Sequence, residues 1–546
     1  MNAGREKTTR ISMILMYVLA FVYVAGICWI NFHGALWCQM DVYTYAFEGR
    51  LMHEARSFFP EGWIFGNQYH IISSPNISAL FYGLVRDSMT SLAIASTLST
   101  LVILLSFRWA FHKFTTKTGM AAGLLCLAGG IIFGTNASTY ISGLQVLYTM
   151  ASYYSSYLIV ILLTVGCWLR MRNGDKTPWA MAGIAMILNF AAGMQSLREM
   201  LVLVIPLAVI EGIAFLIRLA KKASFRDLVL RNRSLLLVIA AFFFELAGHF
   251  FMKSLHVATT PIIGDVELDL SPAGVLANGW ASLKNVLRIS GLSIAADGLK
   301  YLPLSLCALA VVCCVIWSLV RIVRTKDGGP LAISIVFSAI SVFGVFFVGT
   351  FLMRTRDIYY FPYWLMATLS VVYFLDKVKS GRMQVAGIVA LLVIGIVNYA
   401  YNFIPDYKDY HRNHKGLEEF AENLVRQGVK VIYVGDASPI IAAASHDRIV
   451  SQAVWLDVNL QSGYPLSVFP SDKYVPVFDD EHYAHSLVCI SNNYLKFLPT
   501  APGPFRSAME SGLDRFGEMV LGHRDYVLFK PVERVVEPLS YHAETD

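Results

Sequence analysis

The chain has 546 residues, of which 56% are hydrophobic and only 15% are charged. A soluble domain carries about 25% charged residues, so much of this chain requires lipid around it. The net charge of +6 is modest and lies mainly in short connections, which excludes a nucleic-acid-binding surface. The eight cysteines form neither a CxxC pair nor a Cys/His zinc spacing, so they indicate no zinc site and no disulfide framework.

Apolar runs of about 20 residues, the length of helix that crosses the hydrocarbon core, recur as far as residue 403. They predict an α-helical polytopic membrane protein with about eleven transmembrane helices over residues 1–404. Two runs are short, so the number of spans is open by one or two. The predicted spans are Ile11–Ile30, Ser88–Phe111, Met120–Thr135, Tyr154–Arg170, Trp179–Met194, Met200–Leu219, Leu235–Met252, Leu302–Val320, Leu331–Thr350, Pro362–Phe374 and Val385–Phe403.

The connections between these runs alternate in charge. Arg5, Lys7 and Arg10 precede the first run, and every second connection after it is rich in Lys and Arg. Basic connections remain in the cytoplasm. With an odd number of spans, the sequence predicts a multi-pass plasma-membrane protein with a cytoplasmic N-terminus and an extracytoplasmic C-terminal domain.

Two of the predicted outer connections are long, residues 33–87 and residues 256–301. The first contains a predicted helix from Asp41 to Glu54, on which Asp41, Tyr45 and Glu48 share one face. Such a helix is expected to lie along the outer leaflet. Its carboxylates are either the solvated face of an interfacial helix or catalytic groups placed where water meets the membrane.

Arginines also lie on the predicted outer side, against the positive-inside trend. Arg198 falls in a short connection between two runs, and Arg354 and Arg356 closely precede Tyr359 in another. The guanidinium fork suits a phosphate, and tyrosines suit the hydrocarbon chain attached to it. The structural alternatives are a snorkelling side chain at Arg198 and an interfacial turn with its aromatic belt at the second connection.

One apolar run contains two ionisable residues, Glu245 and His249, four positions apart. This spacing places both on one helix face, and polar groups at such depth face the interior of a bundle. They form either a proton or ligand pathway or a mutually satisfied structural pair.

Hydropathy falls after about residue 405, and residues 405–546 are predicted to form a small soluble α/β domain. Gly416–Gln427 has helical spacing, and Val429–Val434 has the pattern of a strand. Ser438-Pro439 suits an N-cap and the first position of a helix, and Gly517–Leu521 with Tyr526–Lys530 suits a terminal hairpin. The chain contains neither GxGxxG nor GxxxxGK, so nucleotide binding is unsupported and the domain is predicted to lack an active site.

These features together resemble the GT-C superfamily of polytopic membrane glycosyltransferases, which use polyprenyl-phosphate or polyprenyl-pyrophosphate sugar donors on the outer face. The family pattern combines an acidic residue in a long first outer loop, amphipathic helices in that loop, outer-leaflet arginines and a soluble C-terminal extension. Asp41, within Gln39-Met40-Asp41, matches the catalytic acidic position. Arg198 and Arg356 match carrier-phosphate ligands. The resemblance covers the architecture from roughly Ile11 to Phe403.

The resemblance implies hexosyl or pentosyl transfer from a polyprenyl-phosphate donor in the membrane lipid to a glycan or lipid acceptor. Asp41 would deprotonate the acceptor hydroxyl, and the arginines would stabilise the departing phosphate. Many members carry a second acidic residue in a later outer loop, but Asn136–Tyr157 contains no Asp or Glu. Glu48 is therefore the substitute catalytic candidate. No metal ligands are predicted, and the use of a divalent cation stays open.

Two other functional classes fit parts of the pattern. In a transporter or lipid flippase, Glu245 and His249 would be a coupling relay and the outer domain a substrate receptor. Against this class, the sequence shows no inverted repeat and no matched pair of broken helices. In a non-catalytic scaffold or sensor, the C-terminal domain would carry the function. Sugar transfer in vitro separates the glycosyltransferase from both alternatives.

Overall fold

The computed structural model describes residues 2–60, 63, 65, 69, 71–134, 144, 147–149, 154–175, 178–220, 232–257, 270–352, 355–434, 439–456, 463–465, 486–491, 519–523 and 526–529. Within these ranges, nine helices are long and apolar enough to cross a membrane, which confirms the predicted polytopic helical class. Each of these nine candidate spans includes one of the long helices of the bundle. These helices are α1 (Asn2–Phe32), α4 (Ser88–Phe111), α7 (Ser155–Arg172), α9 (Ile205–Ala220), α11 (Arg233–Ser254), α13 (Leu302–Thr325), α14 (Pro330–Phe351), α15 (Pro362–Lys377) and α16 (Gly381–Arg426).

The remaining two predicted spans are shorter helices. One is α8 (Trp179–Gln195). The other forms α5 (Lys117–Leu125) and a π turn (Cys126–Gly130), so the predicted end at Thr135 is wrong. The helix ends because Gly129 has a φ of +123°, and a Cβ there would lie 2.9 Å from side-chain atoms of Tyr23 and Leu144. Only glycine fits this backbone and this space.

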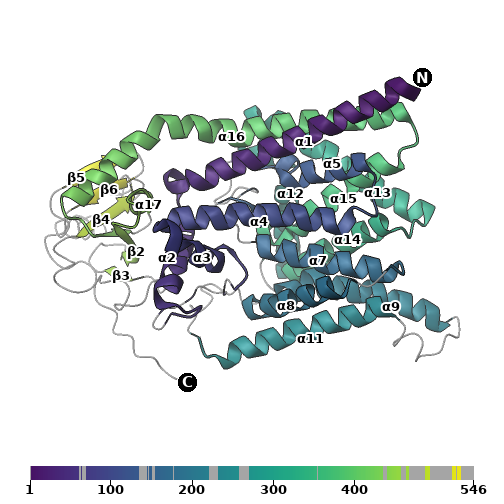
Figure 1. Cartoon of the computed structure of the whole chain (residues 1–546), viewed down its shortest axis with the longest axis horizontal. Coiled ribbons are helices and arrows are strands. Elements are labelled where there is room, and N and C mark those ends of the chain that lie inside the picture. Colours follow the sequence, from purple (N-terminus) through teal and green to yellow (C-terminus); the bar gives the residue numbers. More distant parts are fainter. Residues whose placement is uncertain are drawn as a thin grey trace.

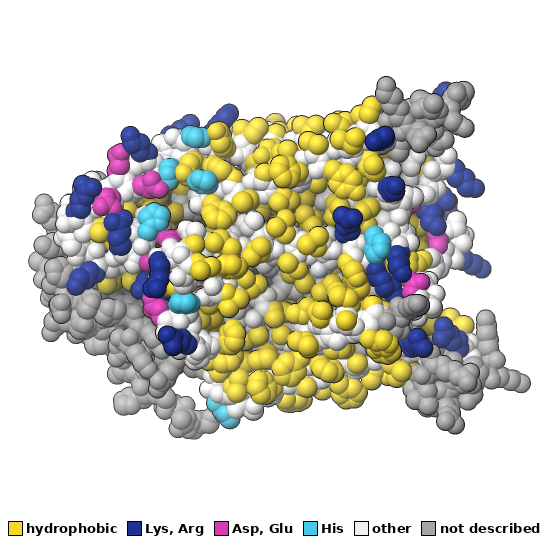
Figure 2. Space-filling model, in the orientation of Figure 1, with side chains coloured by type: hydrophobic (Ala, Val, Ile, Leu, Met, Phe, Trp, Pro, Cys, Tyr) yellow, Lys and Arg dark blue, Asp and Glu magenta, His cyan; other side chains and the backbone are white. Residues whose placement is uncertain are grey.

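The long helices run side by side across the molecule, with the N-terminus at one end and the C-terminal sheet at the other (Figure 1). Figure 2 shows an apolar belt around the middle of this bundle, with charged side chains gathered at both ends. Large side chains such as Phe21, Phe243 and Phe343 are 72%, 61% and 66% exposed. Exposed phenylalanines at this density are stable in a lipid environment, so the belt marks the membrane-embedded zone.

Helices α8 and α11 are in direct backbone contact. A Cβ added at Gly193 would lie 1.9 Å from the carbonyl oxygen of Glu245, and one added at Gly248 would lie 1.9 Å from that of Phe190. Small residues allow membrane helices to approach this closely. A π turn (Met200–Val204) follows α8 and leads into α9, so the connection that carries Arg198 is held beside α11.

The first outer connection contains a 3-10 turn, η1 (Gly34–Trp37), and two helices, α2 (Met40–Ala55) and α3 (Ser74–Val85). The predicted helix over Asp41–Glu54 is therefore confirmed. Helix α2 lies across the end of the bundle and packs on α3 and α4 (Figure 1). Gly49 permits this packing, since a Cβ there would lie 1.9 Å from Ser78 Oγ on α3.

The second outer connection contains α12 (Pro272–Ile289) and two 3-10 turns, η4 (Ile294–Asp297) and η5 (Leu299–Tyr301). Ser271 caps α12 by accepting a hydrogen bond from the Gly274 N–H at 3.0 Å. Helix α12 packs on α14 and on the 3-10 turn η6 (Asp357–Tyr360), which precedes α15. This contact places α12 against the segment that carries Arg356 and Tyr359.

Helix α16 is a single helix of 46 residues that contains Pro405. It crosses the predicted 404/405 domain boundary without a break, so the predicted span Val385–Phe403 and the predicted helix Gly416–Gln427 are parts of one element. Proline removes one hydrogen bond from a helix interior but does not end this helix. Helix α16 therefore leads directly from the membrane bundle into the C-terminal domain (Figure 1).

The C-terminal domain contains a six-stranded sheet in the order β3-β2-β1-β4-β6-β5. Strands β2, β1 and β4 are parallel, and the outer strands pair antiparallel. Their bounds are β1 (Val431–Val434), β2 (Val450–Leu456), β3 (Gly463–Pro465), β4 (Ser486–Ser491), β5 (Met519–His523) and β6 (Tyr526–Phe529). The predicted strand near 429–434 and the predicted terminal hairpin are both present, although β5 begins two residues later than predicted.

One short helix, α17 (Ile440–Ala444), follows β1. Pro439 is its N-cap and provides no side-chain hydrogen bond, so the predicted role of Pro439 as the first helical residue is wrong. The predicted cap Ser438 and its neighbour Asp436 lie outside the described residues. All five residues of α17 are buried, and α17 packs on α16 and η1.

Candidate active site

Arg198 lies in the short connection between α8 and the π turn, at the same end of the bundle as α2. Its Nη1 donates a hydrogen bond to Tyr154 Oη at 2.9 Å. Its guanidinium carbon lies 5.0, 5.6 and 4.5 Å from the ring centroids of Tyr154, Tyr157 and Tyr359. Each of these distances is within cation–π range. Arg198 is therefore held in a cage of three tyrosines, which we call the tyrosine cage.

The tyrosine cage joins segments that are far apart in the sequence. Tyr154 and Tyr157 lie at the start of α7, and Tyr359 lies in η6. The Tyr157 hydroxyl also shares a hydrogen bond of 2.7 Å with Ser196 Oγ, which ties α7 to the connection that carries Arg198. Burial lowers the pKa of Arg198, but the tyrosine hydroxyls raise it by more, so the guanidinium stays charged.

The segment around η6 brings a second predicted arginine to the same place. Asn285 of α12 donates a hydrogen bond to the Thr355 carbonyl at 2.7 Å, and Arg288 lies 3.8 Å from Asp357. Between these anchors, Arg356 is exposed at the N-cap of η6. Burial raises the pKa of Tyr154, and both Arg198 and Arg356 lower it. Arg356 is therefore an electrostatic neighbour of the tyrosine cage. The predicted ligand Arg354 lies outside the described residues.

Helix α2 brings the predicted acidic residues toward the cage. Asp41, Tyr45 and Glu48 share the face of α2 that was predicted from their spacing. Burial raises the pKa of Tyr45 well above its ordinary value, Asp41 and Glu48 raise it further, and Arg198 lowers it. Tyr45 is therefore an electrostatic neighbour of both the acidic residues of α2 and Arg198. Asp41 is exposed, so its carboxylate can meet a substrate.

Glu48 differs from Asp41 in its surroundings. Its side chain is 1% exposed, and its Oε2 accepts a hydrogen bond from Trp63 Nε1 at 3.2 Å. Burial raises the pKa of Glu48 to about 8, against a smaller opposing effect of Trp63. The expectation that this carboxylate lies on a solvated face is therefore wrong. At neutral pH Glu48 is mainly protonated, so it can donate a proton but is a poor base.

The intramembrane pair Glu245 and His249 does not form a hydrogen bond. Both carboxylate oxygens of Glu245 are buried without a hydrogen-bond partner, whereas His249 is only half-buried and lies against Phe250. The alternative of a mutually satisfied pair is therefore wrong. Both carboxylate oxygens of Glu199 are also buried and without hydrogen bonds. Burial and then Glu245 raise the pKa of Glu199, while Arg198 lowers it.

Sequence reasoning did not assign Tyr154, Tyr157 or Glu199 to the site. The two tyrosines lie at the start of an apolar run, where aromatic residues ordinarily mark the membrane interface. Glu199 directly follows Arg198, and its burial depends on α11, which is distant in sequence. The one feature of the sequence that could have indicated these residues was the density of tyrosines near an arginine on the predicted outer side.

The described residues do not form a set of ligands for a divalent cation. They contain no group of three or more His, Cys, Asp or Glu side chains arranged to hold a metal ion. In the site itself, Glu48 is buried against Trp63, which leaves Asp41 as the exposed carboxylate on this face of α2.

Comparison with known proteins identifies the fold. No protein-family model matches the chain, and no curated protein matches it in sequence. The solved structures that match it along most of its length include ArnT from Cupriavidus metallidurans in the apo state and the same protein bound to undecaprenyl phosphate. Both have a TM-score of 0.51 and cover 95% of this chain and 99% of ArnT, at 11% and 10% sequence identity. The likeness shows that this multi-pass membrane protein has the fold of ArnT.

Proposed function

We propose that the chain is a membrane glycosyltransferase that moves a sugar from a polyprenyl-phosphate carrier to a glycan or lipid acceptor of the cell envelope. The observation that carries this proposal is the charged Arg198 in its tyrosine cage, with Asp41 presented on the adjacent helix α2. A guanidinium at the end of the membrane bundle suits the phosphate of a lipid carrier. The structure of ArnT with undecaprenyl phosphate supports this class of donor.

In the proposed reaction, the acceptor hydroxyl oxygen attacks the anomeric carbon of the sugar. Asp41 accepts the hydroxyl proton as general base. The bond between the anomeric carbon and the phosphate oxygen breaks, and its electron pair remains on the departing phosphate. Arg198 and Arg356 stabilise that growing negative charge, while Tyr359 packs beside it. The polyprenyl chain stays in the lipid, so the reaction requires no soluble nucleotide-binding fold.

We place this reaction on the extracytoplasmic side. Lys and Arg dominate the charged groups at the end of the bundle where α1 begins, whereas Asp, Glu and His are mixed with them at the other end (Figure 2). Basic residues are retained in the cytoplasm, so the N-terminus is assigned there. Helix α2 and the C-terminal domain lie at the opposite end (Figure 1). This assignment puts Asp41 and Arg198 on the outer side.

The proposal is tested by carrier binding to the purified full-length protein in lipid nanodiscs. Undecaprenyl phosphate is titrated against the wild type, Arg198→Ala and Arg218→Ala, with phosphatidylglycerol as the comparison anionic lipid. Loss of hydrogen bonds to a charged group costs about 1.5–3 kcal/mol, so Arg198→Ala should weaken binding about 10- to 150-fold. Arg218 is an exposed arginine in the last turn of α9, so its replacement should leave binding unchanged.

Equal affinity of the wild type for both lipids would overturn the proposed donor class. Transfer is then measured with lipid-linked sugars extracted from cell membranes and the matching cell-envelope fraction as acceptor. A transporter or flippase would instead move the lipid between leaflets of proteoliposomes without forming a new glycoside.

A further inference from the structure

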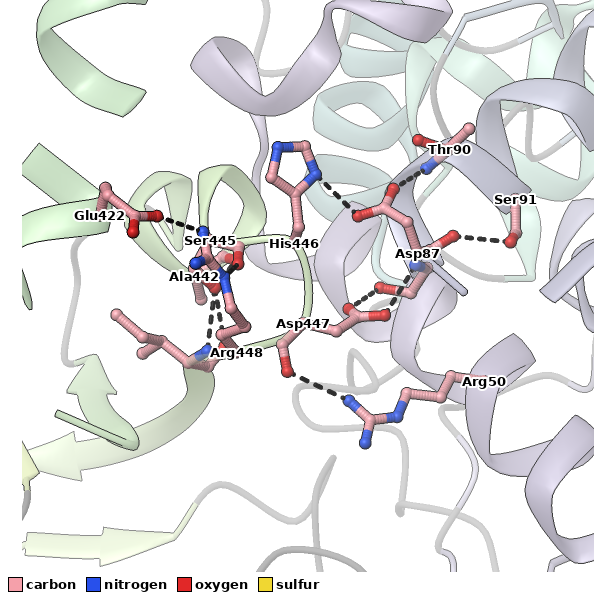
Figure 3. Close-up of polar contacts among 12 residues, drawn as sticks. Arg50, Asp87, Thr90, Ser91, Glu422, Ala442, Ser445, His446, Asp447 and Arg448 are labelled. Carbon is pink, nitrogen blue, oxygen red and sulfur yellow. Dashed lines mark hydrogen bonds and ion pairs between the residues drawn. The ribbon is translucent and has the colours of Figure 1, made fainter. Parts of the chain in front are cut away.

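The C-terminal domain contacts the first outer connection through a sharp corner after α17. At this corner, His446 and Asp447 have φ values of +53° and +63°. The left-handed region is unfavourable for residues other than glycine, and two such residues in succession persist only where surrounding contacts hold them. Figure 3 shows that both side chains of this corner point toward the start of α4.

The contacts at the start of α4 are specific. His446 Nδ1 lies 3.0 Å from Asp87 Oδ2, and Asp87 Oδ1 in turn accepts a hydrogen bond from the Thr90 N–H at 2.6 Å (Figure 3). Asp447 accepts hydrogen bonds from both the N–H and the hydroxyl of Ser88, the former at 2.8 Å. Carboxylates at a helix N-terminus satisfy its open N–H groups. Helix α4 is therefore capped twice, once by its own Asp87 and once by the C-terminal domain.

The same part of the C-terminal domain holds α2. The N–H of Ser451, in β2, donates a hydrogen bond to Tyr43 Oη at 3.0 Å, and Tyr43 is 2% exposed. Arg50 Nη1 lies 3.5 Å from the carbonyl oxygen of Asp447 (Figure 3). Tyr43 is two residues from both Asp41 and Tyr45. The corner and β2 therefore fix the helix that carries the acidic side of the site.

We propose that His446 and Asp447 are positioning residues that hold α2 and α4 so that Asp41 and Tyr45 face the tyrosine cage. The corner forms hydrogen bonds with α2 and α4, whereas the tyrosine cage is built on α7, η6 and the connection after α8. Loss of the corner should therefore impair turnover while sparing carrier binding. The effect on turnover rests on the proposed function, but the docking of α2 does not.

The corner also makes docking depend on pH. The hydrogen bond to Asp87 raises the pKa of His446, burial opposes this, Glu418 raises it and Arg448 lowers it. Burial raises the pKa of Asp87, and the hydrogen bonds from His446 and Thr90 lower it by more, so the net direction is downward. Burial raises the pKa of Asp447, with Asp87 adding to this and Ser88 and Arg50 opposing it.

The directions of these pKa shifts determine how docking depends on pH. Protonated His446 and ionised Asp87 are both favoured in the docked state. The pair of His446 and Asp87 should therefore favour docking most between the ordinary pKa of Asp87 and the ordinary pKa of His446, and this contribution should be lost as pH rises through the raised pKa of His446.

The test uses substitutions that tolerate a left-handed backbone. Asp447→Gly removes the carboxylate without backbone strain, Asp447→Asn keeps an oxygen acceptor, and His446→Asn removes the titrating ring. Arg426→Gln is the matched control, since Arg426 is 72% exposed in the last turn of α16 and pairs with Glu422 of the same helix at 3.5 Å. Each full-length variant is purified in nanodiscs, and hydrogen–deuterium exchange is measured over residues 40–55.

We expect exchange over residues 40–55 to rise at least 10-fold in Asp447→Gly and less in Asp447→Asn, with Arg426→Gln unchanged. After correction for intrinsic rates, wild-type exchange should rise between pH 6 and pH 8.5, and His446→Asn should lose this dependence. Turnover should fall about 10-fold in Asp447→Gly, while affinity for undecaprenyl phosphate changes less than twofold. Unchanged exchange in Asp447→Gly and His446→Asn would overturn the positioning role. Absent turnover in the wild type would contradict the proposed function alone, because the exchange results would still decide the role of the corner.

Discussion

The buried carboxyl of Glu48 makes a quantitative prediction about stability. Burial raises its pKa from 4.5 to about 8, so the folded protein keeps it protonated at pH values where the unfolded chain ionises it. The folded state therefore loses stability as pH rises from 4.5 toward 8, and the loss is constant above that range. Because pH 7 is 2.5 units above 4.5, the loss at pH 7 is about 3 kcal/mol.

Glu48→Gln should remove this loss, because a neutral amide has nearly the same shape and still offers an oxygen to Trp63 Nε1. The new NH₂ group can cost about 1–3 kcal/mol if it is buried without a partner, but that cost does not vary with pH. The apparent Tm of the variant minus that of the wild type should therefore increase steadily from pH 5 to pH 8. Glu54→Gln, at the more exposed end of the same helix, is the matched control.

Thermal unfolding followed by tryptophan fluorescence at pH 5, 6, 7 and 8 provides the measurement. A Tm difference between Glu48→Gln and the wild type that stays constant over this range would refute the reasoning. It would mean that the Glu48 carboxyl is equally ionised in the folded and unfolded protein.

Three further predictions concern the reaction and the topology. Asp41→Asn keeps the size of the side chain but removes its basicity, so it should lower kcat about 10²- to 10⁴-fold with little change in carrier affinity. A matching loss of carrier affinity would assign Asp41 to donor binding instead. Arg356→Ala should weaken both carrier binding and turnover, and Arg356→Lys should restore only part of each because the planar fork is lost; full restoration by lysine would show that charge alone matters. Lys415→Cys, at a side chain 87% exposed on α16, should react with a membrane-impermeant maleimide in intact cells above the wild-type background, and protection there would reverse the topology.

The membrane-embedded helices were predictable because an apolar run of sufficient length needs no tertiary information to be recognised. The predicted helix boundaries were wrong at residues that are apolar but also determine the conformation of the backbone. Gly129 and Gly130 continue the hydropathy of the third run, so the left-handed φ that ends its helix was invisible. Pro405 suggested a boundary, but the helix around it continues into the next domain.

The candidate site was only partly predictable. Arg198 and Arg356 stood out because arginines are unusual on the predicted outer side, and the structure gathers them with Tyr359 around Tyr154. The spacing of Glu48 along α2 indicated a face but not its environment. Its burial depends on Trp63 and on the close approach of α3 at Gly49, which are contacts that helical periodicity does not encode.

Glu245 illustrates the same limit inside the membrane. Its spacing from His249 suggested a pair on one face, whereas the contact of α8 with α11 at Gly193 and Gly248 turns Glu245 inward. Its neighbour there is Glu199, which follows Arg198 in the chain. A spacing of four residues identifies groups that can meet, but the partner helix decides which of them do.

The two proposed tasks of the site rest on different parts of the fold. Tyrosine rings and the Tyr154 hydroxyl lie around Arg198, and these groups lower the cost of burying a cation. They come from helices of the bundle, where the lipid carrier has to enter. The proposed base, Asp41, comes from helix α2, which lies across the end of the bundle and is held there by the C-terminal domain. Carrier binding and acceptor activation can therefore be changed separately, since each depends on contacts that the other does not use.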